Sequence, residues 1–220
     1  MQNIFGAVSQ KWKMRATSTR RKMWDSEYAS GFGDLLKLPE AVEHNLTLVD
    51  FMTNAKKNTT ILDVCCGEGI LLDCLERSGY ERYVGFDFSD VALKNASKRA
   101  NAKTSFTRGI AETFVPEGHF ESIVFNECLY CLAEPLRVIH RYERYLAADG
   151  VILVSLFTKT ERVKLLAAEI STSFKVMRNA SVTNGQGTWE CFMLLGTAAS
   201  APPRSSPRRL LRPRGYGKNL

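Results

Sequence analysis

An acid, a pair of glycines and a second acid have the spacing of a nucleoside-binding site. Residues 61–71 read ILDVCCGEGIL, in which a short apolar run around Asp63 is followed by Gly67 and Gly69 and then by a helical leucine pattern. Asp87 comes twenty residues after Gly67, at the end of a second apolar run. Glycines let the turn bring its backbone against a ligand, and an acid at this distance accepts hydrogen bonds from both ribose hydroxyls. The spacing therefore predicts a nucleoside site at the first strand-to-helix turn.

The same turn lacks the features that bind phosphates. A dinucleotide-binding turn has Gly or Ala three residues after its second glycine, where this chain has Leu72. Neither Lys nor a Ser/Thr pair follows the glycines, as a P-loop requires. A nucleoside cofactor without phosphates fits better, and S-adenosylmethionine is such a cofactor.

Few side chains are suited to acid–base catalysis. Glu127 follows an apolar strand pattern, so we expect it on the ligand side of the sheet, either as a base or as a brace of the main chain. His44 lies in the helical segment 39–54, which could cover the site, whereas His119 and His140 are expected in solvent. A hydroxyl acceptor gains from such a base, while an amine acceptor needs only to be neutral. No metal site is expected, since the sequence contains no second CxxC or CxxH pair.

The elements that position these residues alternate between strand and helix from residue 60 onward. This alternation predicts an α/β fold, a doubly wound and mostly parallel sheet. The Asn184-Gly185 pair between two late strand patterns predicts a C-terminal antiparallel hairpin. Strands are expected at 60–64, 83–86, 103–107, 121–125, 151–157, 174–181 and 188–195, and a helix over 135–146.

The positive charge is concentrated at the two ends of the chain. The 220 residues hold 30 Lys and Arg against 23 Asp and Glu, a net charge of +7. Residues 1–22 and 197–220 each carry six basic residues and no acidic one, which leaves −5 on 23–196. The acidic middle of the chain, residues 23–196, offers no continuous basic groove, so we expect no nucleic acid as partner. Peripheral contact of the two basic ends with a membrane is an open alternative.

The charge and composition also define the expected domains. We expect a helical lid or brace over 1–58, a cofactor-binding domain over 59–196, and a basic, proline-rich disordered tail over 197–220. No apolar run approaches the roughly 20 residues of a membrane span, and no cleaved secretory signal is expected. The six cysteines lack the spacing of a disulfide framework, so a cytoplasmic location is expected.

Short motifs follow one another in a set order between residues 59 and 157. They are the 63–69 turn, Asp87-Phe88, Ile110-Ala111-Glu112 and the stretch 125–130. Together they resemble the motifs of class I S-adenosylmethionine-dependent methyltransferases, whose fold is a seven-stranded, Rossmann-like sheet; Cys65 stands where that family has its first glycine. The resemblance implies S-adenosylmethionine as cofactor, bound by Asp63, Cys65, Gly67, Gly69, Asp87, Phe88, Ala111, Glu112 and Asn126.

Three stretches of the sequence resemble one subgroup of this family more closely. Residues 24–31, Glu43-His44 and 125–130 are similar to a bacterial subgroup that tailors surface polysaccharides and lipo-chitooligosaccharide Nod factors, including the 2-O-methylation of fucose. This implies that 24–31 closes over the cofactor with Tyr28 near its methionine end, and that the acceptor is a sugar hydroxyl. Two alternatives stay open: a small-molecule or protein N-methyltransferase, and a non-enzymatic cofactor-sensing or RNA-binding protein.

Overall fold

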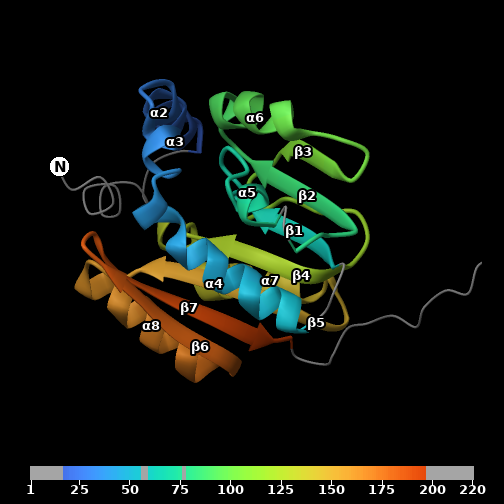
Figure 1. The fold of residues 1–220 in the computed structure, drawn as a ribbon, viewed down its shortest axis with the longest axis vertical. Helices are drawn as coiled ribbons and strands as arrows, with labels where there is room; N and C mark the ends of the chain where they lie inside the picture. Colours follow the sequence, from blue (N-terminus) through green and yellow to red (C-terminus); the bar gives the residue numbers. More distant parts are fainter. Residues whose placement is uncertain (1–16, 56–58, 76–77, 197–220) are drawn as a thin grey trace, which may run out of the picture.

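The computed structural model describes residues 17–55, 59–75 and 78–196 (Figure 1). The segment 197–220, for which we expect a disordered tail, lies outside these residues. Within the described part of the chain, none of the helices combines the length and the hydropathy that a membrane span requires.

Seven strands form one sheet in the order β3-β2-β1-β4-β5-β7-β6 (Figure 1). Strands β1 to β5 pair with one another in parallel, whereas β7 is antiparallel to both β5 and β6. The prediction of a mostly parallel sheet with a C-terminal antiparallel hairpin is therefore confirmed. The strands are β1 (Thr60–Val64), β2 (Arg82–Asp87), β3 (Thr104–Arg108), β4 (Phe120–Asn126), β5 (Leu146–Phe157), β6 (Lys175–Asn184) and β7 (Gly187–Leu195).

Helices precede the sheet and connect its strands. They are α2 (Thr17–Ala29), α3 (Phe32–Leu35), α4 (Pro39–Ala55), α5 (Leu71–Leu75), α6 (Asp90–Ala96), α7 (Pro135–Glu143) and α8 (Glu161–Ser173), with 3-10 turns η1 (Ser97–Arg99) and η2 (Leu129–Cys131). The Ser89 hydroxyl accepts the amide of Ala92 at 3.2 Å and so caps α6. The helix expected over 135–146 ends at Glu143, because Leu146 already belongs to β5. Helix α8, capped by Thr160, was not predicted.

Two apolar layers cover the sheet. Side chains alternate along a strand, so neighbouring residues of one strand pack on opposite faces. Leu62 and Ile123 pack with the residues of α7 and α8, and Ile61 and Val124 pack with those of α4 and α5. The central strands are therefore buried on both faces, as their continuous apolar runs predict.

The parallel strands bring the site together. The carboxyl ends of β1, β2, β4 and β5 lie at one edge of the sheet, where Asn126 pairs in register with Ser155. Helix α2 lies beside α6 and contacts it directly (Figure 1), and α3 packs against α2. We call residues 17–38, which include α2 and α3, the N-terminal segment.

Candidate functional site

One cavity lies at the carboxyl ends of β1, β2, β3 and β4. Its wall comes from the turns after these strands, from the N-terminal segment and from the first turns of α4. Gly69 does not line the cavity, and a Cβ atom on it would lie 3.0 Å from the ring of Phe106. The other residues predicted for the site all line it: Tyr28, His44, Asp63, Cys65, Gly67, Asp87, Phe88, Ala111, Glu112, Asn126 and Glu127.

The turn after β1 has an unusual backbone. Cys65, Gly67 and Gly69 have φ values of 58°, 54° and 75°, in the left-handed region that glycine favours. Cys65 therefore adopts the conformation of the glycine that it replaces, at a cost of about 1 kcal/mol or more. A Cβ atom on Gly67 would lie 2.5 Å from the Tyr28 hydroxyl oxygen, so only glycine permits this close approach of Tyr28.

Asp87 links the first two strand ends. Its Oδ2 accepts the Gly67 amide at 3.0 Å, and its Oδ1 accepts the Ser89 amide at 2.8 Å. Burial raises the pKa of this carboxyl to about 6, although the hydrogen bonds from Ser89 and Gly67 act in the opposite direction. A buried carboxylate at this position is suited to accept further hydrogen bonds from a ligand.

The described protein groups hydrogen-bond only one of the two carboxylate oxygens of Asp63. Its Oδ2 accepts the hydroxyl of Tyr83, whereas its Oδ1 is buried and has no hydrogen-bond partner among the described residues. Burial raises the pKa of Asp63 to about 7. An unpartnered buried carboxylate oxygen is costly. Because Asp63 lines the cavity, a cationic group of a ligand would satisfy it.

The N-terminal segment reaches across the turns after β2 and β3. The Arg20 guanidinium lies 3.2 Å from Glu112 Oε1. Asp25 Oδ1 accepts the Ser89 hydroxyl at 2.7 Å, next to the first turn of α6. Three rings of this segment contact one another and line the cavity: Trp24, Tyr28 and Phe32.

His44 belongs to a polar network at the ends of β4 and β5. Its Nε2 lies 3.1 Å from Asn126 Oδ1, which also accepts the Ser155 hydroxyl at 2.5 Å. The Asn126 amide nitrogen donates to Asn45 Oδ1 at 2.7 Å, and the His44 ring stacks on Trp189. Burial lowers the pKa of His44 to about 4, and its Nδ1 is buried without a partner in the described chain.

Glu127 is held from both sides of its carboxylate. Its Oε2 accepts the Tyr130 hydroxyl at 2.9 Å and the Phe157 amide at 3.2 Å. Its Oε1 lies 3.1 Å from the Ser155 hydroxyl and shares that one hydrogen with the nearer Asn126 Oδ1. The residue has φ 56°, so its backbone turns sharply after β4. Burial raises the pKa of Glu127 to about 7 against these three hydrogen bonds.

Comparison with known proteins identifies the family. The sequence model of the methyltransferase domain family matches residues 37–216. The chain belongs to this family. Its cofactor is S-adenosylmethionine, which supplies an electrophilic methyl group and carries an ammonium and a sulfonium charge. The unpartnered Asp63 oxygen and the close approach at Gly67 fit such a cationic nucleoside.

One curated relative of this methyltransferase is a ribosomal protein L11 methyltransferase from Caulobacter sp. (strain K31). It is 29% identical over 138 residues, which are 60% of this chain and 47% of the relative. The chain therefore spans about half the length of the curated relative that it matches.

Two solved structures have a similar fold. The N-methyltransferase NodS of Bradyrhizobium japonicum WM9, in complex with S-adenosylhomocysteine, has a TM-score of 0.69 and 15% identity over 80% of this chain and 97% of its own. A TehB-like methyltransferase from Corynebacterium glutamicum has a TM-score of 0.61 and 19% identity over 80% of this chain and 100% of its own. At such low identity these similarities show the fold alone.

Sequence reasoning missed several residues of the methyltransferase site. Ser155 is the one polar residue in the apolar run VILVSLF, and this was a signal that it has a polar partner. Glu68 stands between the two glycines of the turn and is buried, 3% exposed. Arg20 carried no signal, because its approach to Glu112 depends on how α2 crosses the domain.

Proposed function

We propose that this methyltransferase transfers the methyl group of S-adenosylmethionine to a hydroxyl group, with His44 as the general base. The observation that carries the proposal is the buried, unpartnered Nδ1 of a neutral histidine in the wall of the cavity. A hydroxyl becomes strongly acidic as its oxygen bonds to the methyl carbon. A base therefore needs to be unprotonated and within hydrogen-bond reach rather than strongly basic.

The Asn126 network supports the tautomer that this role requires. Asn126 Oδ1 accepts from Ser155, and its amide nitrogen donates to Asn45, so the oxygen faces His44. His44 Nε2 must then donate to that oxygen and carry the imidazole proton. The lone pair of the neutral ring consequently lies on Nδ1, where a proton from the acceptor would be received.

The contacts of Glu127 support a brace rather than a second base. Both carboxylate oxygens accept hydrogen bonds from the protein, and these bonds join the end of β4 to η2 and β5. The chemistry of the proposed step therefore rests on His44, and Glu127 holds the strand end that carries Asn126.

We propose the following contacts with the cofactor. Asp87 and Phe88 hold the ribose, and the adenine lies against Ala111 and Glu112. The methionine end lies between Tyr28 and the turn with Cys65 and Gly67, where Asp63 accepts its ammonium group. Gly69 shapes the turn from behind, and the N-terminal segment covers the bound cofactor. The cavity lining and the contacts of Asp63 and Tyr28 support this arrangement.

The acceptor that we propose is a small molecule or oligosaccharide with a sugar hydroxyl, of the lipo-chitooligosaccharide type. The support for it is the similarity of residues 24–31 and 125–130 to the polysaccharide-tailoring subgroup. We place the reaction in the cytoplasm, and the support for this is that all six cysteines are free thiols.

Labelled-methyl transfer tests the proposal. Purified protein with methyl-labelled S-adenosylmethionine should label oligosaccharide or glycolipid fractions as an alkali-stable ether. His44→Ala should lower kcat by about 10²-fold or more, as expected for a general base. His119→Ala, at an exposed position, serves as the matched control. Label found on amines or protein, or full turnover by His44→Ala, would show that the acceptor or the base is wrong.

A further inference from the structure

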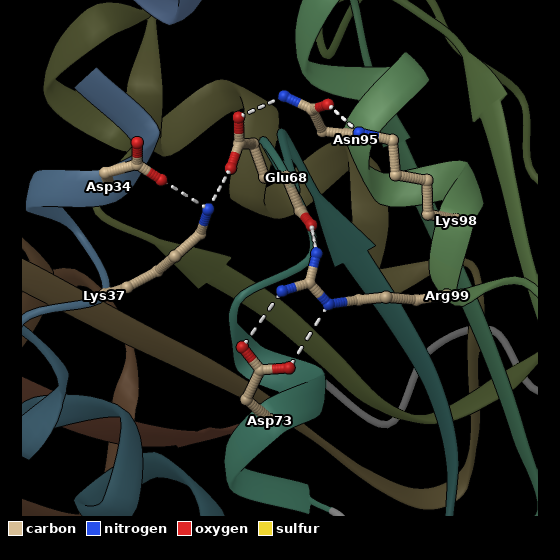
Figure 2. Close-up of polar contacts among 7 residues, drawn as sticks. All are labelled: Asp34, Lys37, Glu68, Asp73, Asn95, Lys98 and Arg99. Carbon is tan, nitrogen blue, oxygen red and sulfur yellow. Dashed lines mark hydrogen bonds and ion pairs between the residues drawn. The ribbon is translucent and has the colours of Figure 1, made fainter. Parts of the chain in front are cut away.

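Glu68 joins the cofactor turn to two other segments of the chain. Its Oε2 lies 2.8 Å from the Lys37 ammonium, and its Oε1 accepts the Asn95 amide at 2.7 Å (Figure 2). Lys37 follows α3, whereas Asn95 lies in α6. The side chain of Glu68 is 4% exposed and that of Lys37 is 36% exposed, so the ion pair is partly buried.

The backbone of Glu68 is held as well. The Arg99 guanidinium donates to the Glu68 carbonyl at 3.0 Å and forms a two-pronged contact with Asp73, at 3.2 and 3.1 Å (Figure 2). Arg99 therefore holds the turn to α5 and η1 through contacts that do not involve Lys37. Loss of the Lys37 contact would therefore weaken the hold on the N-terminal segment and leave the turn in place.

The N-terminal segment lies directly against the Glu68 carboxylate. A Cβ atom on Gly33 would lie 2.4 Å from the Glu68 Cδ, so the backbone of α3 touches this group. Tyr28 of the same segment touches Gly67, the preceding residue of the turn. The segment thus meets the turn at two adjacent places, and both Tyr28 and Glu68 line the cavity.

We infer that Glu68 is a positioning residue that, through its ion pair with Lys37, holds the N-terminal segment closed over the cofactor and so sets the lifetime of the bound cofactor. Removal of Lys37 leaves a buried carboxylate with Asn95 as its remaining side-chain donor, which favours an open segment. The pair must break before the segment opens, so its loss speeds the opening that precedes cofactor release. The inference rests on the cofactor site and not on the proposed acceptor or base.

The test uses Lys37→Met, which removes the ammonium and keeps most of the side-chain stem. The rates of S-adenosylhomocysteine association and dissociation are measured by stopped-flow on the full chain. We expect dissociation to be about tenfold faster and association to change by less than about twofold, since the pair is partly exposed. With a methyl acceptor, KM for the cofactor should rise while kcat stays near the wild-type value.

Two further variants separate positioning from general stability. Lys37→Arg should restore slow dissociation, and Glu68→Gln should reproduce the effect of Lys37→Met without adding to it in the double variant. Lys164→Met, which breaks the exposed Lys164–Glu161 pair on α8, is the control and should leave both rates unchanged.

The outcomes also distinguish this inference from the proposed function. A wild-type dissociation rate in Lys37→Met would overturn the inference. So would dissociation that is equally faster in the control variant Lys164→Met. Fast dissociation in Lys37→Met from a protein that methylates no hydroxyl would support the inference and contradict the proposed function.

Discussion

Replacement of Glu127 by Gln should stabilise the fold at alkaline pH. The amide can keep the geometry of the carboxylate, because its oxygen can accept from Tyr130 and Phe157 and its NH₂ can donate to the Ser155 oxygen. The variant therefore changes the charge at a buried position and little else. In the wild type, burial of the ionised carboxylate is a cost that grows with pH.

The size and sign of the effect follow from the pKa of Glu127. Burial raises this pKa from 4.5 to about 7, so between these values the folded protein holds a proton that the unfolded chain has released. The free energy of unfolding therefore falls as pH rises from 4.5 through 7. A shift of this size corresponds to about 3 kcal/mol, present in full above pH 7 and absent below pH 4.5.

Urea unfolding at a series of pH values measures the effect. The difference between Glu127→Gln and wild type should be near zero at pH 4.5 and approach about 3 kcal/mol at pH 8.5. The contributions of His44, Asp63 and Asp87 are the same in both proteins and cancel. Glu117→Gln, at an exposed carboxyl, is the control. A difference that does not depend on pH, or a more stable wild type at pH 8.5, would show that burial of the Glu127 carboxylate is not the cause.

Two further predictions concern the cofactor turn and the base. Gly67→Ala should weaken S-adenosylhomocysteine binding by about tenfold or more in calorimetry, because it puts strain on a left-handed backbone and pushes against Tyr28; Gly185→Ala, with open space around it, should bind normally. In Glu127→Gln, which lacks the carboxyl with a pKa of about 7, kcat at saturating cofactor should stay constant down to about pH 5 and fall as pH drops through about 4, because burial holds the pKa of His44 at about 4. An acidic limb near pH 6.5 would contradict that role.

Local patterns were sufficient to predict the sheet. Continuous apolar runs such as 151–157 predict buried parallel strands, and Asn184-Gly185 predicts the hairpin. Helix α8 was missed although the sequence carries a signal for it: Thr160 caps its start, and its buried residues have the spacing of an amphipathic helix, namely Val163, Leu166, Ala167 and Ile170.

Site residues at the ends of neighbouring strands could be predicted from the sequence. Site residues that come together through the packing of distant elements could not. The Asp63 and Asp87 spacing is local to two strand ends, so it predicted their place in one cavity. The burial of His44 and its bond to Asn126 depend on how α4 crosses the sheet. The pairing of Lys37 with Glu68 likewise depends on the path of the N-terminal segment.

Calorimetry with S-adenosylmethionine on wild type, Asp87→Ala and Asp90→Ala measures whether the cavity binds the cofactor through Asp87. Asp87 lies in the cavity wall, while Asp90 is a half-exposed acid three residues further on, in α6. We expect saturable binding by wild type and Asp90→Ala, and binding at least about tenfold weaker by a folded Asp87→Ala, because the ribose hydroxyls lose a charged acceptor. Absence of binding by the wild type, or equal binding by Asp87→Ala, would contradict it.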